Sequence, residues 1–235
     1  IMKSYFNIVS LRGTIFLPQI IFDWTFVSEM LKILPDYVPT NNTPQIINGV
    51  IVNSTDWMLG TQDGIERLIF QPQKIDFILN KESSYSERDI DEFSKKCDKI
   101  FSKILELRNA KASRLAIAPT FKYIGDISTL KSFIQKIYAT RVFKEEALDN
   151  CEFSQVYRVN ENIGDSVFKI NYLSKFYTSG NIVIVNGVNT IQEYNLVDFD
   201  INTFNDTNYS FDIDLVKTFF SKSSGFCSDF MTFYF

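Results

Sequence analysis

Two aspartates late in the chain have a spacing that could hold a divalent cation. Asp198 and Asp200 are separated by one residue in a run that is predicted to be a β-strand, and alternate residues of a strand point to the same face of a sheet. Paired carboxylates suit a hard cation such as Mg²⁺ or Mn²⁺. With Lys169 or Lys217 beside them, they could serve a nuclease or a phosphoesterase. The competing interpretation is a solvent-facing strand, which is favoured.

The sequence lacks the residues that most other catalytic sites require. It has no histidine, which removes Ser-His-Asp and Cys-His catalysis and most common zinc sites. Its glycines are scattered singly, so no phosphate-binding loop is present. Cys97, Cys151 and Cys227 lie far apart, and their odd number argues against a disulfide framework. We therefore expect no cofactor, and a non-enzymatic protein is favoured over an enzyme.

A group of lysines on one predicted helix could bind nucleic acid: Lys95, Lys96, Lys99 and Lys103. A nucleic-acid-binding surface usually gives a domain a high pI. This chain has a net charge of −4 and a pI near 5.0. A solvated helix face, balanced by neighbouring acidic residues, is the favoured interpretation, and nucleic-acid binding remains an alternative.

The end of the sequence is unusually aromatic. Its last ten residues contain Phe226, Phe230, Phe233, Tyr234 and Phe235. A segment this apolar is not expected to remain in water, so it either packs on its own sheet or docks on another subunit. These five residues are the candidate interface, for another protein or for self-association. The loops predicted at residues 36–45 and 202–210 are secondary candidates for recognition.

The most regular part of the sequence lies between Ile65 and Gly125. Two strand-like runs, 65–70 and 74–80, flank a proline-containing turn. Ser86 is a suitable N-cap for a long helix. The apolar face of that helix recurs at steps of three and four, at Ile90, Phe93, Cys97, Ile100, Phe101, Ile104 and Leu107. Cys97 is therefore expected to be a buried, inert thiol.

The other predicted elements surround this region. Before it we expect a strand over 5–16 with a bulge at Gly13, a helix from Asp23 to Pro35, a polar loop over 36–44 and a hairpin at Asn48-Gly49. After it we expect a helix over residues 127–138, with Asp126 as a candidate cap. Strands over 153–159, 166–173, 181–188 and 191–201 follow, with one turn at Ser179-Gly180, and then a helix over 211–221 that ends by Gly225.

This order predicts an α+β fold in which helices cover antiparallel sheets. The elements of residues 1–125 are echoed in residues 126–235, so two similar, closely packed halves are one interpretation. One continuous sheet with helices on one face is the other. No linker rich in proline, glycine or serine separates the halves.

Several segments match the pattern of a known family. They are Trp57-Met58-Leu59, Asp63-Gly64, the strand pair and long helix, Arg114-Leu115-Ala116-Ile117, and Asp198-Phe199-Asp200 before a helix. In this pattern the chain resembles a sporadically distributed family of uncharacterised bacterial proteins. It departs at Lys122-Tyr123-Ile124-Gly125, where the family has an Arg-Tyr-Ile-Asn-like segment. The resemblance implies no activity.

These observations favour a non-enzymatic interaction protein. No run approaches the roughly 20 apolar residues that cross a bilayer, and the first residues do not resemble a signal peptide, so a cytoplasmic location without membrane contact is expected. The predicted role is that of an accessory or regulatory subunit of a bacterial assembly. By analogy with the patchy distribution of the family, that role could lie in phage–host conflict, as an antiviral defence.

Overall fold

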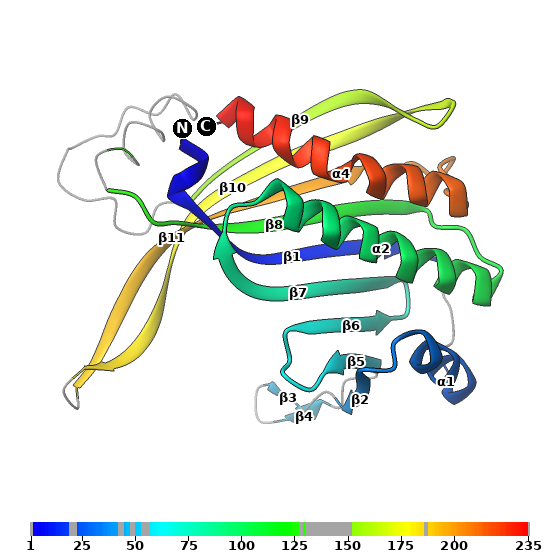
Figure 1. Ribbon diagram of the computed structural model, residues 1–235, viewed down its shortest axis with the longest axis horizontal. Helices are drawn as coiled ribbons and strands as arrows, with labels where there is room; N and C mark the ends of the chain where they lie inside the picture. The colour runs from blue at the N-terminus through cyan, green and yellow to red at the C-terminus, as the bar shows by residue number, and fades with distance from the viewer. Residues whose placement is uncertain are drawn as a thin grey trace.

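The computed structural model describes residues 2–18, 23–41, 45–47, 50–52, 57–126, 129, 152–185 and 188–234. In these residues one nine-stranded antiparallel sheet has three helices packed against it (Figure 1). The strands of the sheet are β1 (Phe6–Phe16), β2 (Tyr37–Asn41), β5 (Trp57–Thr61), β6 (Glu66–Gln71), β7 (Lys74–Ser84), β8 (Arg114–Tyr123), β9 (Glu152–Ile163), β10 (Ser166–Val185) and β11 (Val188–Thr203). The helices are α1 (Trp24–Ile33), α2 (Glu87–Arg108) and α4 (Ile213–Tyr234). A short 3-10 helix (Met2–Tyr5) precedes β1, and β3 (Gln45–Ile47) pairs with β4 (Val50–Val52) in a separate small sheet.

Outward from the central pair β1 and β8, the strands on the two sides of the sheet follow nearly the same order. The full order runs β2-β5-β6-β7-β1-β8-β11-β10-β9, with β1 and β8 paired antiparallel at the centre. On one side β1 pairs with β7, and α2 follows β7 in the chain. On the other side β8 pairs with β11, and α4 follows β11. Both helices are 22 residues long. The predicted α+β class with antiparallel strands under helices is confirmed. Of the two arrangements that the sequence left open, the sheet is continuous. β8 lies before the predicted boundary at residue 125, but it pairs with β11 as β1 pairs with β7, so we count the second half from β8.

All three helices lie on one face of the sheet. Helices α2 and α4 run side by side across its centre (Figure 1). The strands turn apolar side chains toward them, among them Leu11, Ile15, Ile117, Phe121 and Phe199, which are all buried. Helix α1 covers the β6 end, where the Phe26 ring meets Phe70 edge to face at 5.4 Å. The core is therefore a single layer between the sheet and its helices.

Helix α2 begins at the N-cap that its sequence predicts and ends at a left-handed asparagine. The Asp89 N–H donates a hydrogen bond to Ser86 Oγ at 3.2 Å, and Asn109 ends the helix in a left-handed conformation. Cys97 is fully buried, and burial raises its pKa well above the usual value, as expected for an inert thiol. Gly13 of β1 lies directly beneath it, because a Cβ there would overlap Cys97 Sγ. The predicted bulge at Gly13 is wrong: the register of β1 shifts between Ile8 and Ser10 instead.

Three other boundaries differ from their predictions. β10 continues through Ser179 and Gly180, because β11 pairs with both residues, so four predicted strands are three. Helix α4 continues past Gly225, since buried apolar side chains recur beyond it. Residues 37–41 form β2 and not a loop, because they pair with β5.

Two predictions fall at least partly on residues outside the described part of the chain. The helix predicted over residues 127–138 lies outside it, apart from Thr129. So does the turn at Asn48-Gly49, although the strands β3 and β4 on either side of it pair as predicted.

Candidate functional site

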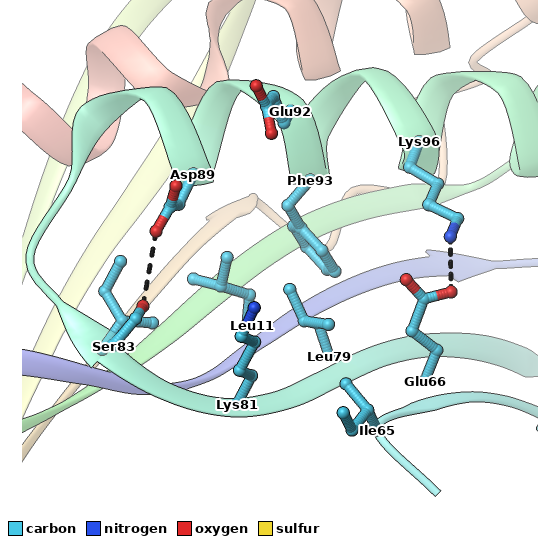
Figure 2. A pocket seen from close by; sticks show the side chains of 11 residues that line it. Leu11, Ile65, Glu66, Leu79, Lys81, Ser83, Asp89, Glu92, Phe93 and Lys96 are labelled. Atoms are coloured by element: carbon cyan, nitrogen blue, oxygen red, sulfur yellow. Dashed lines mark hydrogen bonds and ion pairs between the residues drawn. The ribbon is translucent and has the colours of Figure 1, made fainter. Parts of the chain in front are cut away.

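A groove of about 350 Å³ lies between α2 and the strands beneath it (Figure 2). Its apolar lining consists of Ile8, Leu11, Ile65, Leu79 and Phe93. Charged side chains come from both sides, namely Glu66 and Lys81 from the strands and Asp89, Glu92 and Lys96 from the helix. An apolar floor with a charged rim is a surface that suits binding.

The groove opens where the sheet is irregular. β6 pairs with β7 only as far as Leu79, so residues 81–84 of β7 have β1 on one side and no described strand on the other. The register shift between Ile8 and Ser10 lies at the same level of the sheet. Such shifts bend a strand locally. The bend and the missing neighbour together leave space under α2.

The charged groups around this groove mostly bind one another. Lys96 forms an ion pair with Glu66 (Figure 2), which also accepts a hydrogen bond from the Tyr37 hydroxyl. Burial and this carboxylate raise the pKa of Tyr37 well above its usual value. Ser83 Oγ donates to Asp89 at 3.3 Å. Several polar groups of this groove are therefore bound to other side chains of the protein. A general acid–base pair would instead need groups that can reach a substrate.

Asp198 and Asp200 lie in a second groove, on the sheet face opposite the helices. This groove, of about 360 Å³, crosses β7, β1, β8, β11 and β10. Both aspartates line it, as their spacing predicts, together with Arg12 and Lys175. Lys169 and Lys217, the lysines proposed to assist them, do not line it. The groove is thus bounded by cations as well as by carboxylates.

The surroundings of the two aspartates do not form a cluster of metal ligands. Asp200 Oδ1 accepts a hydrogen bond from Asn202 Nδ2 at 2.8 Å. Asp198 has one buried oxygen without a hydrogen bond. Burial of Tyr177, followed by the nearby charge of Asp198, raises the pKa of Tyr177 to about 12. Within the described residues no three His, Cys, Asp or Glu side chains gather where a metal ion could bind. A pair of carboxylates alone provides few of the oxygen ligands that Mg²⁺ or Mn²⁺ requires.

The lysine face of α2 is largely neutralised. Lys95 pairs with Asp91 at 2.6 Å, Lys103 pairs with Glu106 at 2.9 Å, and Lys96 pairs with Glu66. Lys99 is exposed on the same helix. Three of the four candidate lysines therefore have a carboxylate beside them, which weakens the attraction of this face for phosphates.

The structure separates the five aromatic residues of the candidate interface. Phe226 and Phe230 are buried in the protein's own core, with the Phe230 ring 4.3 Å from that of Phe199. Both side chains are therefore part of this chain's own core. Phe233 is 65% exposed, and its ring meets Tyr157 of β9 edge to face at 5.3 Å. The side chain of Tyr234 and all of Phe235 lie outside the described part of the chain.

Phe233 lies beside an apolar surface on β9 that local sequence patterns do not reveal. β9 is the last strand of the sheet and pairs only with β10 among the described strands. Its Val156, Tyr157 and Val159 are 48%, 37% and 46% exposed. We name these three residues and Phe233 the β9 edge patch, in which Tyr157, Val159 and Phe233 lie on the helix side of the sheet and Val156 lies on the other side. The strand itself was predicted, but its place at the edge depends on the strand order, which local patterns do not contain.

The two secondary recognition loops are partly structured. Residues 37–41 form β2. In residues 204–210, the Tyr209 ring packs against Phe168 at 5.1 Å, and its hydroxyl accepts a hydrogen bond from the Lys169 N–H at 3.0 Å. Tyr209 therefore anchors its loop to β10.

Comparisons with known proteins give this chain no relative: no family model, no curated protein and no solved structure matches it. The resemblance to the sporadic bacterial family stays a prediction. No helix in the described residues is long and apolar enough to cross a membrane.

Proposed function

We propose that this protein is a non-enzymatic interaction protein, an accessory or regulatory subunit of a bacterial cytoplasmic assembly, which docks through the β9 edge patch. The observation that supports this proposal most directly is the open edge of β9. The strand is 12 residues long, and the backbone N–H and C=O groups of its alternate residues point to an outer side to which no described strand is bonded. An unpaired strand edge is a template for pairing with another chain.

The chemistry of β9 strengthens this proposal. Proteins usually block an edge strand by keeping it short or by placing proline, lysine or a bulge on it. β9 is long, it contains neither proline nor lysine, and its register with β10 is regular. Exposed valines and an exposed phenylalanine lie beside that edge. Covering them would remove apolar surface from water and satisfy the open backbone groups.

The two grooves support a binding function more than a catalytic one. The groove under α2 combines an apolar floor with charges that already have partners. Because residues 81–84 of β7 are open on the β6 side, that groove is a second place where an extended segment could bind. A role in phage–host conflict is proposed only by analogy with the resembled family.

Placement of a photo-crosslinking residue tests the proposed docking surface. We would introduce it at Val156 in the β9 edge patch, and separately at Ile191 as a control. Ile191 is 66% exposed in β11 and lies outside the patch. In the native cell, irradiation is expected to join a protein to position 156 and not to position 191. Equal products at both positions, or none at 156, would contradict the proposal.

A metal-dependent nuclease or phosphoesterase remains the alternative that one observation favours, namely the shared groove of Asp198 and Asp200. It predicts that Mg²⁺ or Mn²⁺ raises the melting temperature, and that the double variant Asp198→Asn, Asp200→Asn removes the rise. A melting temperature that is constant over a titration with both ions would reject it.

A further inference from the structure

We infer that the occupant of the β9 edge patch is a second copy of this chain, bound by antiparallel pairing of the two β9 strands around a twofold axis. This inference rests on the proposed docking function and specifies the partner. A twofold axis makes both copies use the same surface, so the surface must be complementary to itself. The sequence of β9 satisfies that condition when the axis passes beside Val156.

In this register the apolar side chains face one another. Val156 lies opposite the partner's Val156, and Val159 lies opposite the partner's Phe153. The side chains at 153, 155, 157 and 159 belong to the helix side of the sheet, and those at 152, 154, 156 and 158 to the other side, because β9 pairs regularly with β10. Pairs of aromatic and β-branched residues on neighbouring strands stabilise a sheet.

The charges of β9 also fit this register. Arg158 lies diagonally across from the partner's Glu152, on the same face of the joined sheet. Diagonal neighbours on adjacent strands are close enough for long side chains to interact. Arg158 donates to Asn171 at 3.1 Å and Glu152 pairs with Lys175 at 3.0 Å within one copy. Neither side chain has to leave its face of the sheet to reach the partner. Like charges do not face each other in this arrangement.

The other end of the sheet explains why pairing would stop at two copies. β2, the opposite edge strand, is five residues long and contains Pro39. Proline cannot donate a hydrogen bond to a neighbouring strand, and a short strand offers little edge. Of the two end strands of the described sheet, β9 therefore offers the longer edge, and joining two β9 edges around the twofold axis closes the assembly as a dimer.

Single cysteines at two matched valines test the occupant and the register together. The variants Val156→Cys and Val159→Cys would be made in a chain that carries Cys151→Ser. Both valines lie on β9 and are about equally exposed. Only position 156 is near its own counterpart across the axis, since the two copies of residue 159 are separated by about 20 Å of strand. Under mild oxidation, a disulfide-linked dimer is expected for Val156→Cys and not for Val159→Cys.

Light scattering on the purified chain provides the independent measurement. The unmodified protein is expected to have the mass of a dimer, and Val156→Lys the mass of a monomer, with Ile191→Lys as the control that remains dimeric. A dimer that persists in Val156→Lys, or equal disulfide formation at 156 and 159, would overturn the inference. A monomeric protein whose position 156 cross-links to a different protein in cells would overturn the second copy but keep the proposed function. A monomer with no cross-link at position 156 would remove both.

Discussion

The two outer edges of the sheet differ although the described strands follow a similar order outward from β1 and from β8. At one end, β2 is five residues long and interrupted by Pro39. At the other, β9 is 12 residues long and exposes valines beside the ring of Phe233. Among the described strands, the first edge offers little backbone for further pairing and the second has no neighbour on its outer side. The comparison locates the proposed function at the β9 end of the sheet, and it shows that two similar strand orders can end in different surfaces.

The long helices of the two halves also contact the sheet differently. Helix α2 approaches β1 closely, because Gly13 leaves room for the Cys97 sulfur. Helix α4 packs on the sheet largely through aromatic rings, such as Phe230 against Phe199 and Tyr172. Close packing and aromatic packing are both dense solutions, but they should respond differently to mutation.

The largest effect is expected for Phe230→Ala in α4. It would leave a cavity between α4 and β11 and lower the free energy of unfolding by about 3–5 kcal/mol. The matched control is Phe233→Ala, one turn later on the same helix, where the ring is exposed. In urea unfolding at a concentration where the protein is monomeric, the control is expected to change stability by less than about 0.5 kcal/mol. Similar losses for both would show that Phe233 belongs to the core, against the comparison.

A smaller loss is expected for Gly13→Ala in β1. The added methyl group would overlap Cys97 Sγ, and overpacking of this kind costs about 1–3 kcal/mol. Cys97→Ala removes the overlapping atom, so the double variant should be more stable than the two single losses predict. A double-mutant cycle by urea unfolding measures this coupling. Additive losses would mean that α2 does not depend on close approach at Gly13.

A modest gain is expected for Gly225→Ala, in the interior of α4. A Cβ at this position would meet no atom within 4 Å, and alanine is favoured over glycine inside a helix by roughly 0.5–1 kcal/mol. Thermal unfolding should therefore show a higher melting temperature. A lower melting temperature would indicate that α4 bends at Gly225, unlike α2, which contains no glycine.

The smallest effect is expected for pH between 6 and 8. The chain has no histidine, the side chain that ordinarily titrates in this range. Burial raises the pKa of Cys227 to about 12, and burial with the nearby Asp198 raises that of Tyr177 to about 12. Since both pKa values exceed those of the unfolded chain, stability is fully present below about pH 8.5 and is lost as the pH rises through 12.

Melting temperatures measured from pH 6 to pH 11 test this expectation. The curve should be flat up to about pH 8 and should then fall. A clear slope between pH 6 and 8 would show that a side chain other than Cys227 and Tyr177 titrates near neutral pH on folding.

Local features of the fold could be predicted from the sequence, and long-range ones could not. Ser86 and Asp23 cap α2 and α1 as predicted, because capping depends on residues only three positions apart. The turn predicted at Ser179-Gly180 failed because pairing with β11 outweighs the local preference of two residues. The helix end predicted at Gly225 was wrong for a similar reason. Burial of Phe226 and Phe230 beyond it stabilises further turns of α4.

In the candidate site, too, local features could be predicted from the sequence and long-range ones could not. The two-residue period of a strand was enough to place Asp198 and Asp200 in one groove. It could not supply Arg12, which reaches that groove from the other half of the sheet. Nor could it show that β9 is an edge, because edges are defined by which strands pair, and β1 pairs with a strand more than a hundred residues away.

The central position of β1 also sets the order in which a newly made chain can fold. β1 is synthesised before the other described strands, but one of its two neighbours, β8, is synthesised only after the whole of α2. A nascent chain that ends at α2 can pair β1 with β7 and cover it with the helix, while the other side of β1 stays open. Contacts between such distant segments slow folding, and open strands invite association with other chains. Synthesis of β8 therefore protects β1 as well as starting the second half.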